Sequence, residues 1–236
     1  MLIPIIGAGT TGSVAATDPN WANVELLLKF NGSDASTTIT DSSTNGTSCT
    51  ASGDAQLDTA KFKFGGSSLL LDGTGDYVTV TGGGSELAPG SGDFTIEFWI
   101  WWNSVSGTQV MYEPRDSGSA GRPVIYKNSS DKLIFYDNSA LISGTTTLTT
   151  GAWHHIALSK NSGSTRMYLN GVQEGSTYSD STTYTNPTGY PRIGVQDGGA
   201  ALSNYVNGWI DSLRVTIGTG RYPTAFTPPT EEFPTS

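Results

Sequence analysis

Residues 94–100 read Phe94-Thr95-Ile96-Glu97-Phe98-Trp99-Ile100, and apolar side chains occupy every second position. A period of two is that of a β-strand, so the four apolar side chains are predicted to face one way, into a core. We expect a half-exposed sheet in which Phe98 is buried. The opposite face, which carries Trp99 and Trp101, is expected to be the more accessible to solvent.

Similar short segments, each bounded by Gly, Asp, Asn or Ser, recur along the chain. The loop 161–164 and the dipeptide Asn170-Gly171 predict tight turns between successive strands. No segment keeps a helical period for three turns, and at most Ser85 to Ala88 makes one turn. The predicted fold class is therefore all-β, a two-sheet antiparallel β-sandwich of the jelly-roll kind. The other expected strands are Val24 to Phe30, Ser68 to Leu71, Tyr77 to Thr81, Gln109 to Tyr112, Arg122 to Lys127, Lys132 to Tyr136, His154 to Lys160, Arg166 to Leu169, Pro191 to Val195 and Gly208 to Ile217.

The composition excludes several classes of protein. With 12 Lys and Arg against 21 Asp and Glu the net charge is −9, whereas nucleic-acid binding needs clustered basic residues. No run of eighteen apolar residues occurs, so no membrane-spanning helix is expected. Cys49 is the one cysteine, so the fold has no intrachain disulfide.

The length of 236 residues suits one all-β domain. Residues 1–20 are rich in small residues and end in Asp18-Pro19-Asn20, so we expect a flexible N-terminal docking segment there. Its apolar side chains are interrupted by Pro4 and Gly7, which favours ordering by a partner over an independent helix. The sandwich domain is assigned to residues 21–236, with an extended C-terminal tail from about residue 218.

Several motifs follow one another in an order that resembles the laminin G-like branch of the concanavalin A-like lectin/glucanase superfamily. The resemblance spans roughly residues 21 to 217 and implies two antiparallel sheets curved into a jelly roll, with binding loops on the concave face or rim. The closing segment 220–230 resembles the tail of such modules in phage and marine viral proteins. The motifs are Leu26-Leu27-Leu28-Lys29-Phe30-Asn31-Gly32, Asp41-Ser42-Ser43-Thr44-Asn45-Gly46, Phe64-Gly65-Gly66-Ser67-Ser68-Leu69, Asp72-Gly73-Thr74-Gly75-Asp76-Tyr77-Val78, the stretch from Phe94, Trp153-His154-His155-Ile156-Ala157, Tyr168-Leu169-Asn170-Gly171 and Gly208-Trp209-Ile210-Asp211-Ser212-Leu213-Arg214-Val215.

The resemblance does not imply catalysis. The related β-glucanases carry paired acidic residues, Glu-x-Asp-x-x-Glu, on one strand, because retaining hydrolysis needs an acid/base and a nucleophile about 5 Å apart. Glu97 has no Asp or second Glu at the alternate positions of its strand. We therefore expect a protein that is not an enzyme.

A structural Ca²⁺ site is one hypothesis for three oxygen-bearing residues. Ca²⁺ takes several hard oxygen ligands, and Asp41, Asn45 and Asp211 are the candidates. The resemblance supports Asp211 directly and the other two only by loop position. The alternative is that Asp41 and Asn45 form Asx-turns with their own backbone, and that Asp211 caps a strand end.

Aromatic residues are the candidates for ligand binding, because sugar rings stack on flat apolar faces. The predicted ligand-binding residues are Trp99, Trp101, Tyr112 and Tyr126. The alternative is that these rings pack between the sheets or under loops. His154 and His155 are adjacent, so in a strand they point to opposite faces and cannot share a metal.

Two overlapping functions follow. The first is a non-enzymatic module that binds a glycan or another cell-surface polymer. The second is a phage structural component, a capsid decoration or tail fibre protein, docked on a larger assembly through residues 1–20 and located at the virion surface. The alternatives are a secreted, extracellular bacterial carbohydrate-binding module and a glycoside hydrolase, which would lack its carboxylate pair.

Overall fold

A computed structural model describes residues 17–116, 121–187, 189–197 and 201–236. Within these residues the regular structure consists of strands and two single 3-10 turns, η1 (Trp21–Asn23) and η2 (Ser85–Leu87). The all-β prediction is confirmed, and the single turn expected at residues 85–88 is η2. No helix in the described part of the chain is long and apolar enough to cross a membrane.

The first sheet has eight strands in the order β13-β12-β11-β6-β15-β4-β3, and β1 also pairs with β15. The long strand β15 has a bulge between Asp211 and Arg214; its first half pairs with β4 and its second half with β1. The strands are β1 (Val24–Leu28), β3 (Gln56–Asp58), β4 (Ser68–Asp72), β6 (Phe94–Trp102), β11 (Trp153–Asn161), β12 (Ser164–Leu169), β13 (Val172–Ser179) and β15 (Asn207–Ile217).

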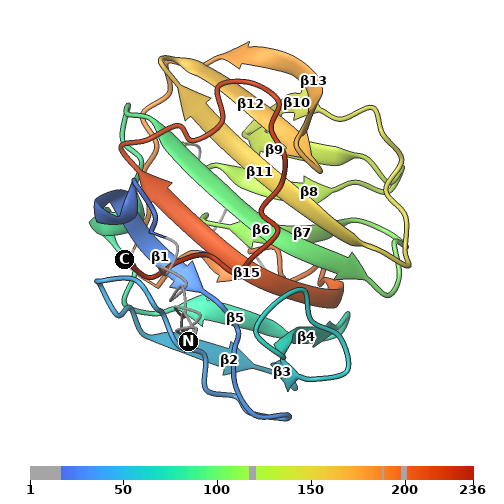
Figure 1. The fold of residues 1–236 in the computed structure, drawn as a ribbon. Coiled ribbons are helices and arrows are strands. Elements are labelled where there is room, and N and C mark those ends of the chain that lie inside the picture. Colours follow the sequence, from blue (N-terminus) through green and yellow to red (C-terminus); the bar gives the residue numbers. More distant parts are fainter. Residues whose placement is uncertain (1–16, 117–120, 188, 198–200) are drawn as a thin grey trace, which may run out of the picture.

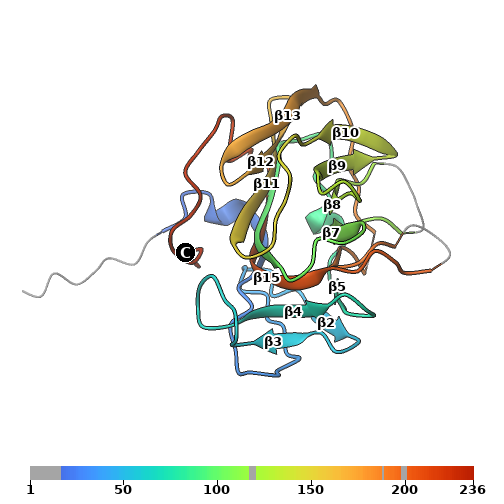
Figure 2. The same ribbon diagram turned by 90° about the vertical axis from the view of Figure 1, so that its right-hand side faces the viewer.

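The second sheet has seven strands in the order β10-β9-β8-β7-β14-β5-β2, and all its pairings are antiparallel. Figures 1 and 2 show the two sheets as facing layers, with β11 to β13 opposite β8 to β10. The predicted two-sheet sandwich is thereby confirmed. Its strands are β2 (Cys49–Ser52), β5 (Tyr77–Val80), β7 (Gln109–Glu113), β8 (Val124–Lys127), β9 (Leu133–Asp137), β10 (Ser139–Ser143) and β14 (Arg192–Ile193).

Two tight turns connect β11, β12 and β13 as a meander. Ser162 and Gly163 have φ angles of 49° and 73°, and Asn170 and Gly171 have 51° and 78°. Positive φ at both central residues is the type I′ geometry that suits the twist of a two-residue hairpin. Asn and Gly tolerate this conformation best, which explains why the dipeptide Asn170-Gly171 marks a turn.

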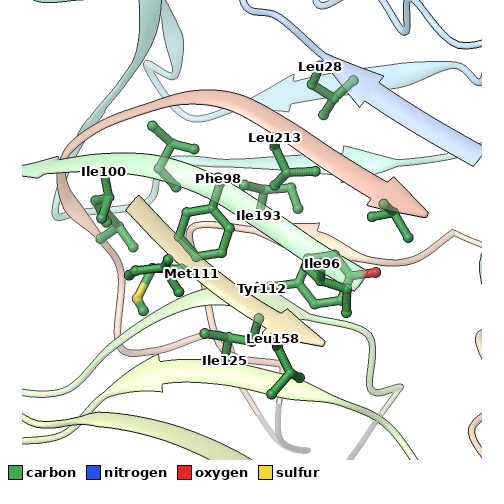
Figure 3. Packing of buried hydrophobic residues seen from close by; sticks show 14 of the residues in the cluster. Leu28, Ile96, Phe98, Ile100, Met111, Tyr112, Ile125, Leu158, Ile193 and Leu213 are labelled. Carbon is green, nitrogen blue, oxygen red and sulfur yellow. The ribbon is translucent and has the colours of Figure 1, made fainter. Parts of the chain in front are cut away.

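The core fills the space between the sheets (Figure 3). Ile96, Phe98 and Ile100 of β6 are each at most 1% exposed and face Met111 and Ile125 of the second sheet. The period-two prediction for this strand, including the burial of Phe98, is therefore confirmed.

The opposite face of β6 is not open to solvent as expected. Residues 218–236, called here the C-terminal tail, run back across the outer face of the eight-stranded sheet, over β12, β11, β6 and β15 (Figure 1). The tail is tied to the sheet where Arg221 N donates to Thr95 Oγ1 at 2.9 Å and Phe226 N to Gly171 O at 3.0 Å. Figure 2 shows the tail on the side of this sheet that faces away from the other sheet. The prediction of a half-exposed sheet is therefore only partly right: the tail covers β6 at Thr95 and Glu97, whereas Trp101 nearer the other end of the strand stays half-buried.

The N-terminal boundary also needs correction, because Asp18 is an integral part of the domain. Its side chain is 2% exposed and accepts from Arg214 Nη1 at 2.8 Å and from Arg221 Nη1 at 2.9 Å. Its main-chain N–H donates to the carbonyl of Ser236 at 2.7 Å, so the two ends of the described chain lie side by side. Residues 1–16 of the expected docking segment lie outside the described residues.

Candidate functional site

The four predicted ligand-binding residues lie in three different places. Tyr126 is on the outer face of the seven-stranded sheet, and Trp99 and Trp101 are on the outer face of the eight-stranded sheet. Tyr112 is 1% exposed and belongs to the core between the sheets, where burial strongly raises the pKa of its hydroxyl. Tyr112 is therefore not a surface residue, because the bulge between Val110 and Tyr112 turns its ring inward.

A pocket of about 250 Å³ lies at Tyr126. In β8 and β9 the residues Ile125 and Phe135 face the core, so period two directs Tyr126 and Tyr136 to the outer face. Their rings meet edge to face with centroids 6.1 Å apart. The pocket, which we call the tyrosine pocket, is lined by Thr108, Val110, Arg115, Val124, Tyr126, Asn128, Tyr136 and Gln196.

Arg115 is held in a fixed orientation in this pocket by the buried Glu113. The guanidinium donates from Nε to Oε1 at 2.8 Å and from Nη2 to Oε2 at 2.6 Å. Its Cζ lies 5.2 Å from the centroid of the Tyr136 ring, within reach of a cation–π interaction. Burial raises the pKa of Glu113, and the pairing with Arg115 offsets only part of this rise. In turn, the hydrogen bonds to Glu113 raise the pKa of Arg115.

The polar groups of the tyrosine pocket can serve as hydrogen-bond partners for a ligand. Asn128 uses its amide oxygen to accept from the main-chain N–H groups of Ser130 and Lys132, both at 3.0 Å. Its amide nitrogen has no partner within the described part of the chain. This amide nitrogen and the hydroxyl groups of Thr108 and Tyr126 are hydrogen-bond donors next to the rings of Tyr126 and Tyr136. Apolar ring faces bordered by a few fixed polar groups are the chemistry that recognises a sugar.

Trp99 is almost fully covered. Its side chain is 5% exposed, and it packs edge to face against Phe64 at 6.0 Å and against His155 at 5.0 Å. Lys63 Nζ lies 4.1 Å from the indole centroid. The ring therefore supports the loop above it and has little free surface for a ligand. Trp101, two residues further along β6, is half-buried.

The structure does not bring the three predicted calcium ligands into one site. Oδ1 of Asp41 accepts from Leu27 N and Ser43 N, both at 2.9 Å, and Oδ2 accepts from Thr47 N at 2.8 Å. This is the Asx-turn alternative, in which the carboxylate also accepts a hydrogen bond from β1 and so joins the loop to that strand. The amide nitrogen of Asn45 donates to Glu25. Within the described residues no group of three His, Cys, Asp or Glu is placed to hold a metal.

Asp211 anchors a loop in place of a metal. It is fully buried, and Oδ2 accepts from Lys63 N at 2.7 Å and from Phe64 N at 3.1 Å. Burial raises the pKa of Asp211 to about 6, because these hydrogen bonds only partly offset the loss of hydration. The carboxylate oxygens of Asp211 and Asp41 are already used by the main chain, so these residues do not fit a shared Ca²⁺ site.

Glu97 is buried in a charged network beneath the C-terminal tail. Oε1 accepts from Arg214, and Oε2 accepts from the Tyr222 hydroxyl at 2.8 Å and lies 3.2 Å from His155 Nε2. Burial raises the pKa of Glu97, but Arg214 and the neighbouring His155 and Arg221 outweigh it and hold the pKa below its usual range. A fully covered, paired carboxylate of this kind stabilises the fold and has no access to substrate.

Both histidines are buried, and the one cysteine, Cys49, is half-buried. Both His154 and His155 are buried, on opposite faces of β11: His154 lies against Trp102 and His155 against Trp99 and Phe226. Their opposite directions agree with the sequence, but the expected outward-facing histidine is covered by the tail. Burial raises the pKa of the Cys49 thiol to about 12, which disfavours the nucleophilic thiolate.

The fold is a two-sheet antiparallel β-sandwich. A family model described as the concanavalin A-like lectin/glucanases superfamily, of the laminin G type, matches residues 72–217. The chain belongs to this family. No curated protein sequence matches it.

Solved structures with the same fold include carbohydrate-binding and receptor-binding domains. Domain 4 of AbnA, an extracellular arabinanase of Geobacillus stearothermophilus solved with arabinotriose, is 18% identical with a TM-score of 0.59, over 84% of this chain and 94% of that one. The binding domain of botulinum neurotoxin DC, solved with rat synaptotagmin II, is 17% identical with a TM-score of 0.60. The match covers 92% of this chain but only 50% of the toxin chain. At these identities the likeness shows the fold alone.

Proposed function

We propose that the protein is a non-enzymatic glycan-binding module and that the tyrosine pocket is its binding site. The observation that carries the proposal is the set of two tyrosines and a fixed Arg115 around one concavity on the outer face of a sheet. A volume of about 250 Å³ suits one sugar ring better than a chain enclosed along its length. The ligand is therefore expected to bind by a terminal or side-branch sugar.

The family and its neighbours support a binding role. The AbnA domain was solved with arabinotriose, and a botulinum neurotoxin binding domain was solved with SialylT. The burial of Glu97 under the tail and its pairing with Arg214 support the absence of hydrolysis. Retaining hydrolysis needs a second carboxyl group about 5 Å from the first and open to substrate.

A glycan array carrying arabino-oligosaccharides and sialylated glycans tests this proposal. Binding without release of reducing sugar is the expected result. Tyr126→Ala is expected to lower the affinity about fivefold or more, if stacking on its ring contributes about 1–3 kcal/mol, as it does for other flat rings on aromatic side chains. Val172→Ala, which shortens an exposed apolar side chain outside the pocket, is the control and should bind like the wild type. Hydrolysis of any array glycan would contradict the proposal.

A virion surface is the proposed setting, with an extracellular carbohydrate-binding module as the alternative. The support is the resemblance of segment 220–230 to the closing segment of modules in phage and marine viral proteins. Docking on a capsid or tail through residues 1–20 belongs to this proposal. Because Asp18 is hydrogen-bonded to Arg214 and Arg221 of the domain, the docking contact is assigned to the residues before it. Copurification of the full chain with virus particles, and its loss when residues 1–16 are removed, is the expected result. Particles that retain the shortened chain would contradict it.

A further inference from the structure

A row of three tryptophans crosses the outer face of the eight-stranded sheet. Trp153 of β11 is directly opposite Trp101 of β6, which in turn is opposite Trp209 of β15. All three side chains are half-buried, and the Trp101 and Trp153 ring centroids are 6.1 Å apart. We call these residues the tryptophan row. The C-terminal tail contacts β6 at Thr95 and Glu97, nearer the other end of the strand.

Two lysines of the loop between β3 and β4 lie over indoles of this face, Lys61 over two members of the tryptophan row and Lys63 over the neighbouring Trp99. Lys61 Nζ is 4.7 Å from the Trp101 ring centroid and 5.4 Å from that of Trp209, and Lys63 Nζ is 4.1 Å from that of Trp99. Such distances give favourable cation–π interactions. The ammonium groups are thereby held next to apolar ring surface.

The backbone of this loop is fixed from below. The buried Asp211 accepts from the N–H groups of Lys63 and Phe64, and the Ser68 hydroxyl donates to the Lys61 carbonyl at 2.6 Å. A fixed backbone lowers the entropic cost of presenting two charges to a ligand. The loop and the tryptophan row are therefore a preorganised surface.

The two lysines carry charge that the described part of the protein does not neutralise. In the described ranges neither Lys61 nor Lys63 forms an ion pair, although acidic residues outnumber basic ones 21 to 12 over the whole chain. Phe62 lies between them in the sequence and is 47% exposed. It is one of two large apolar side chains that are exposed among the described residues. Positive charge beside exposed aromatic surface fits a ligand that is both anionic and partly apolar.

We propose that the Lys61–Phe64 loop and the tryptophan row form a second binding surface, for an acidic polysaccharide. Sugar rings pack on the aromatic surface of Phe62 and the tryptophan row, and carboxylate or sulfate groups pair with Lys61 and Lys63. The surface lies on the opposite face from the tyrosine pocket, so the proposal is independent of that site.

Charge favours a polysaccharide over an anionic membrane as the occupant. Two lysines give little attraction to an anionic bilayer, and a chain of net charge −9 is repelled from that bilayer as a whole. A polysaccharide strand is narrow and can meet the two lysines without bringing the acidic remainder of the protein against a charged plane. Stacking on the aromatic rings adds to its binding.

Biosensor surfaces carrying alginate, dextran sulfate or neutral dextran test the proposal with the full chain. The wild type is expected to bind one or both acidic polymers and not dextran, with affinity that falls as salt is raised. The Lys61→Gln/Lys63→Gln variant should bind the acidic polymers at least tenfold more weakly. Its melting temperature should match the wild type, since the loop is held by main-chain hydrogen bonds. Adding the double lysine change to Tyr126→Ala should weaken binding to the acidic polymers by the same factor as in the wild type.

Lys132→Gln is the matched control for loss of a positive charge. This residue is next to β9 of the other sheet, and Lys132→Gln should bind the acidic polymers like the wild type. The proposal is overturned if the double lysine variant binds as well as the wild type, if neutral dextran binds equally, or if no acidic polymer binds. Binding to phosphatidylserine vesicles without binding to either acidic polymer would assign the surface to a membrane and would also overturn it.

Discussion

Arg214 donates from Nε at 3.0 Å and from Nη2 at 2.7 Å to the same oxygen of Glu97, in the interior beneath the C-terminal tail. The third donor nitrogen of the guanidinium reaches Asp18, so one arginine joins the central strand of a sheet to the start of the domain. Arg221 of the tail bonds the same aspartate. Charged groups from three distant parts of the sequence therefore cover the part of this outer face around Glu97.

Replacing Asp18 by Ala is expected to destabilise the fold. The change leaves Arg214 and Arg221 buried without their shared carboxylate, and breaking a buried ion pair costs about 3–5 kcal/mol. Chemical denaturation checks this, with Glu231→Ala in the exposed part of the tail as the control. A chain that starts at Trp21 should lose a similar amount. Unchanged stability in both variants would show that the two arginines do not depend on Asp18.

The dependence of stability on pH should contain a distinct contribution from Asp211. Its pKa in the folded state, about 6, lies above the unfolded value of 3.8. At a pH between these two values the Asp211 carboxyl is therefore protonated in the native state and ionised in the unfolded state. Stability from this group therefore rises by about 1 kcal/mol as the pH falls from 7 to 5. Glu97 and Asp18 act in the opposite sense, because their lowered pKa values make stability decrease as the pH falls below about 4.

Asp211→Asn isolates this contribution. The amide oxygen can accept from Lys63 and Phe64 as the carboxylate does, but the side chain no longer titrates. The free energy of unfolding of the variant should therefore lack the gain between pH 7 and pH 5 that the wild type shows. Equal pH profiles for the two proteins would mean that Asp211 titrates at an ordinary pKa. Asp211→Ala should be less stable at both pH values.

Calcium is not expected to stabilise the protein through Asp41. This carboxylate accepts from three main-chain N–H groups and from the Ser43 hydroxyl, so Asp41→Ala should lower stability by about 2–4 kcal/mol. Addition of a chelator should leave the melting temperature unchanged. A fall in melting temperature with chelator that Asp41→Ala abolishes would show that the oxygens hold an ion instead.

The sequence identifies strands that face the core more readily than strands at the edges. The alternation of apolar residues from Phe94 to Ile100 predicts burial of one side of this strand, and the dipeptide Asn170-Gly171 predicts a turn. Strands β2, β3 and β10 were not predicted, and β13 was implied only by the turn at Asn170-Gly171, because these strands are short or polar and are held by backbone pairing that leaves no hydrophobic period. Segments that cover a sheet obey no period either, so the burial of Trp99 under the loop with Phe64 and of His155 under Phe226 of the tail could not be predicted from their strands.

The outward direction of Tyr126 and Tyr136 has a signal in the sequence, because each follows an apolar residue, Ile125 or Phe135, that faces the core. That Tyr126 binds a ligand stays a prediction. The fixed Arg115 could not be predicted, because its orientation depends on the pairing of Glu113 with a side chain two residues away in the loop after β7. The bulge that turns Tyr112 inward likewise has no mark in the sequence.

Mapping amide chemical shifts by two-dimensional NMR while titrating an oligosaccharide selected on the glycan array tests the central claim most directly. The expected result is a set of saturating shifts confined to residues 108–110, 124–128 and 136 with Gln196, and their loss in Tyr126→Ala. The claim is contradicted if the saturating shifts lie elsewhere, for example around Trp101 and Trp209, or if Tyr126→Ala binds the oligosaccharide with unchanged affinity.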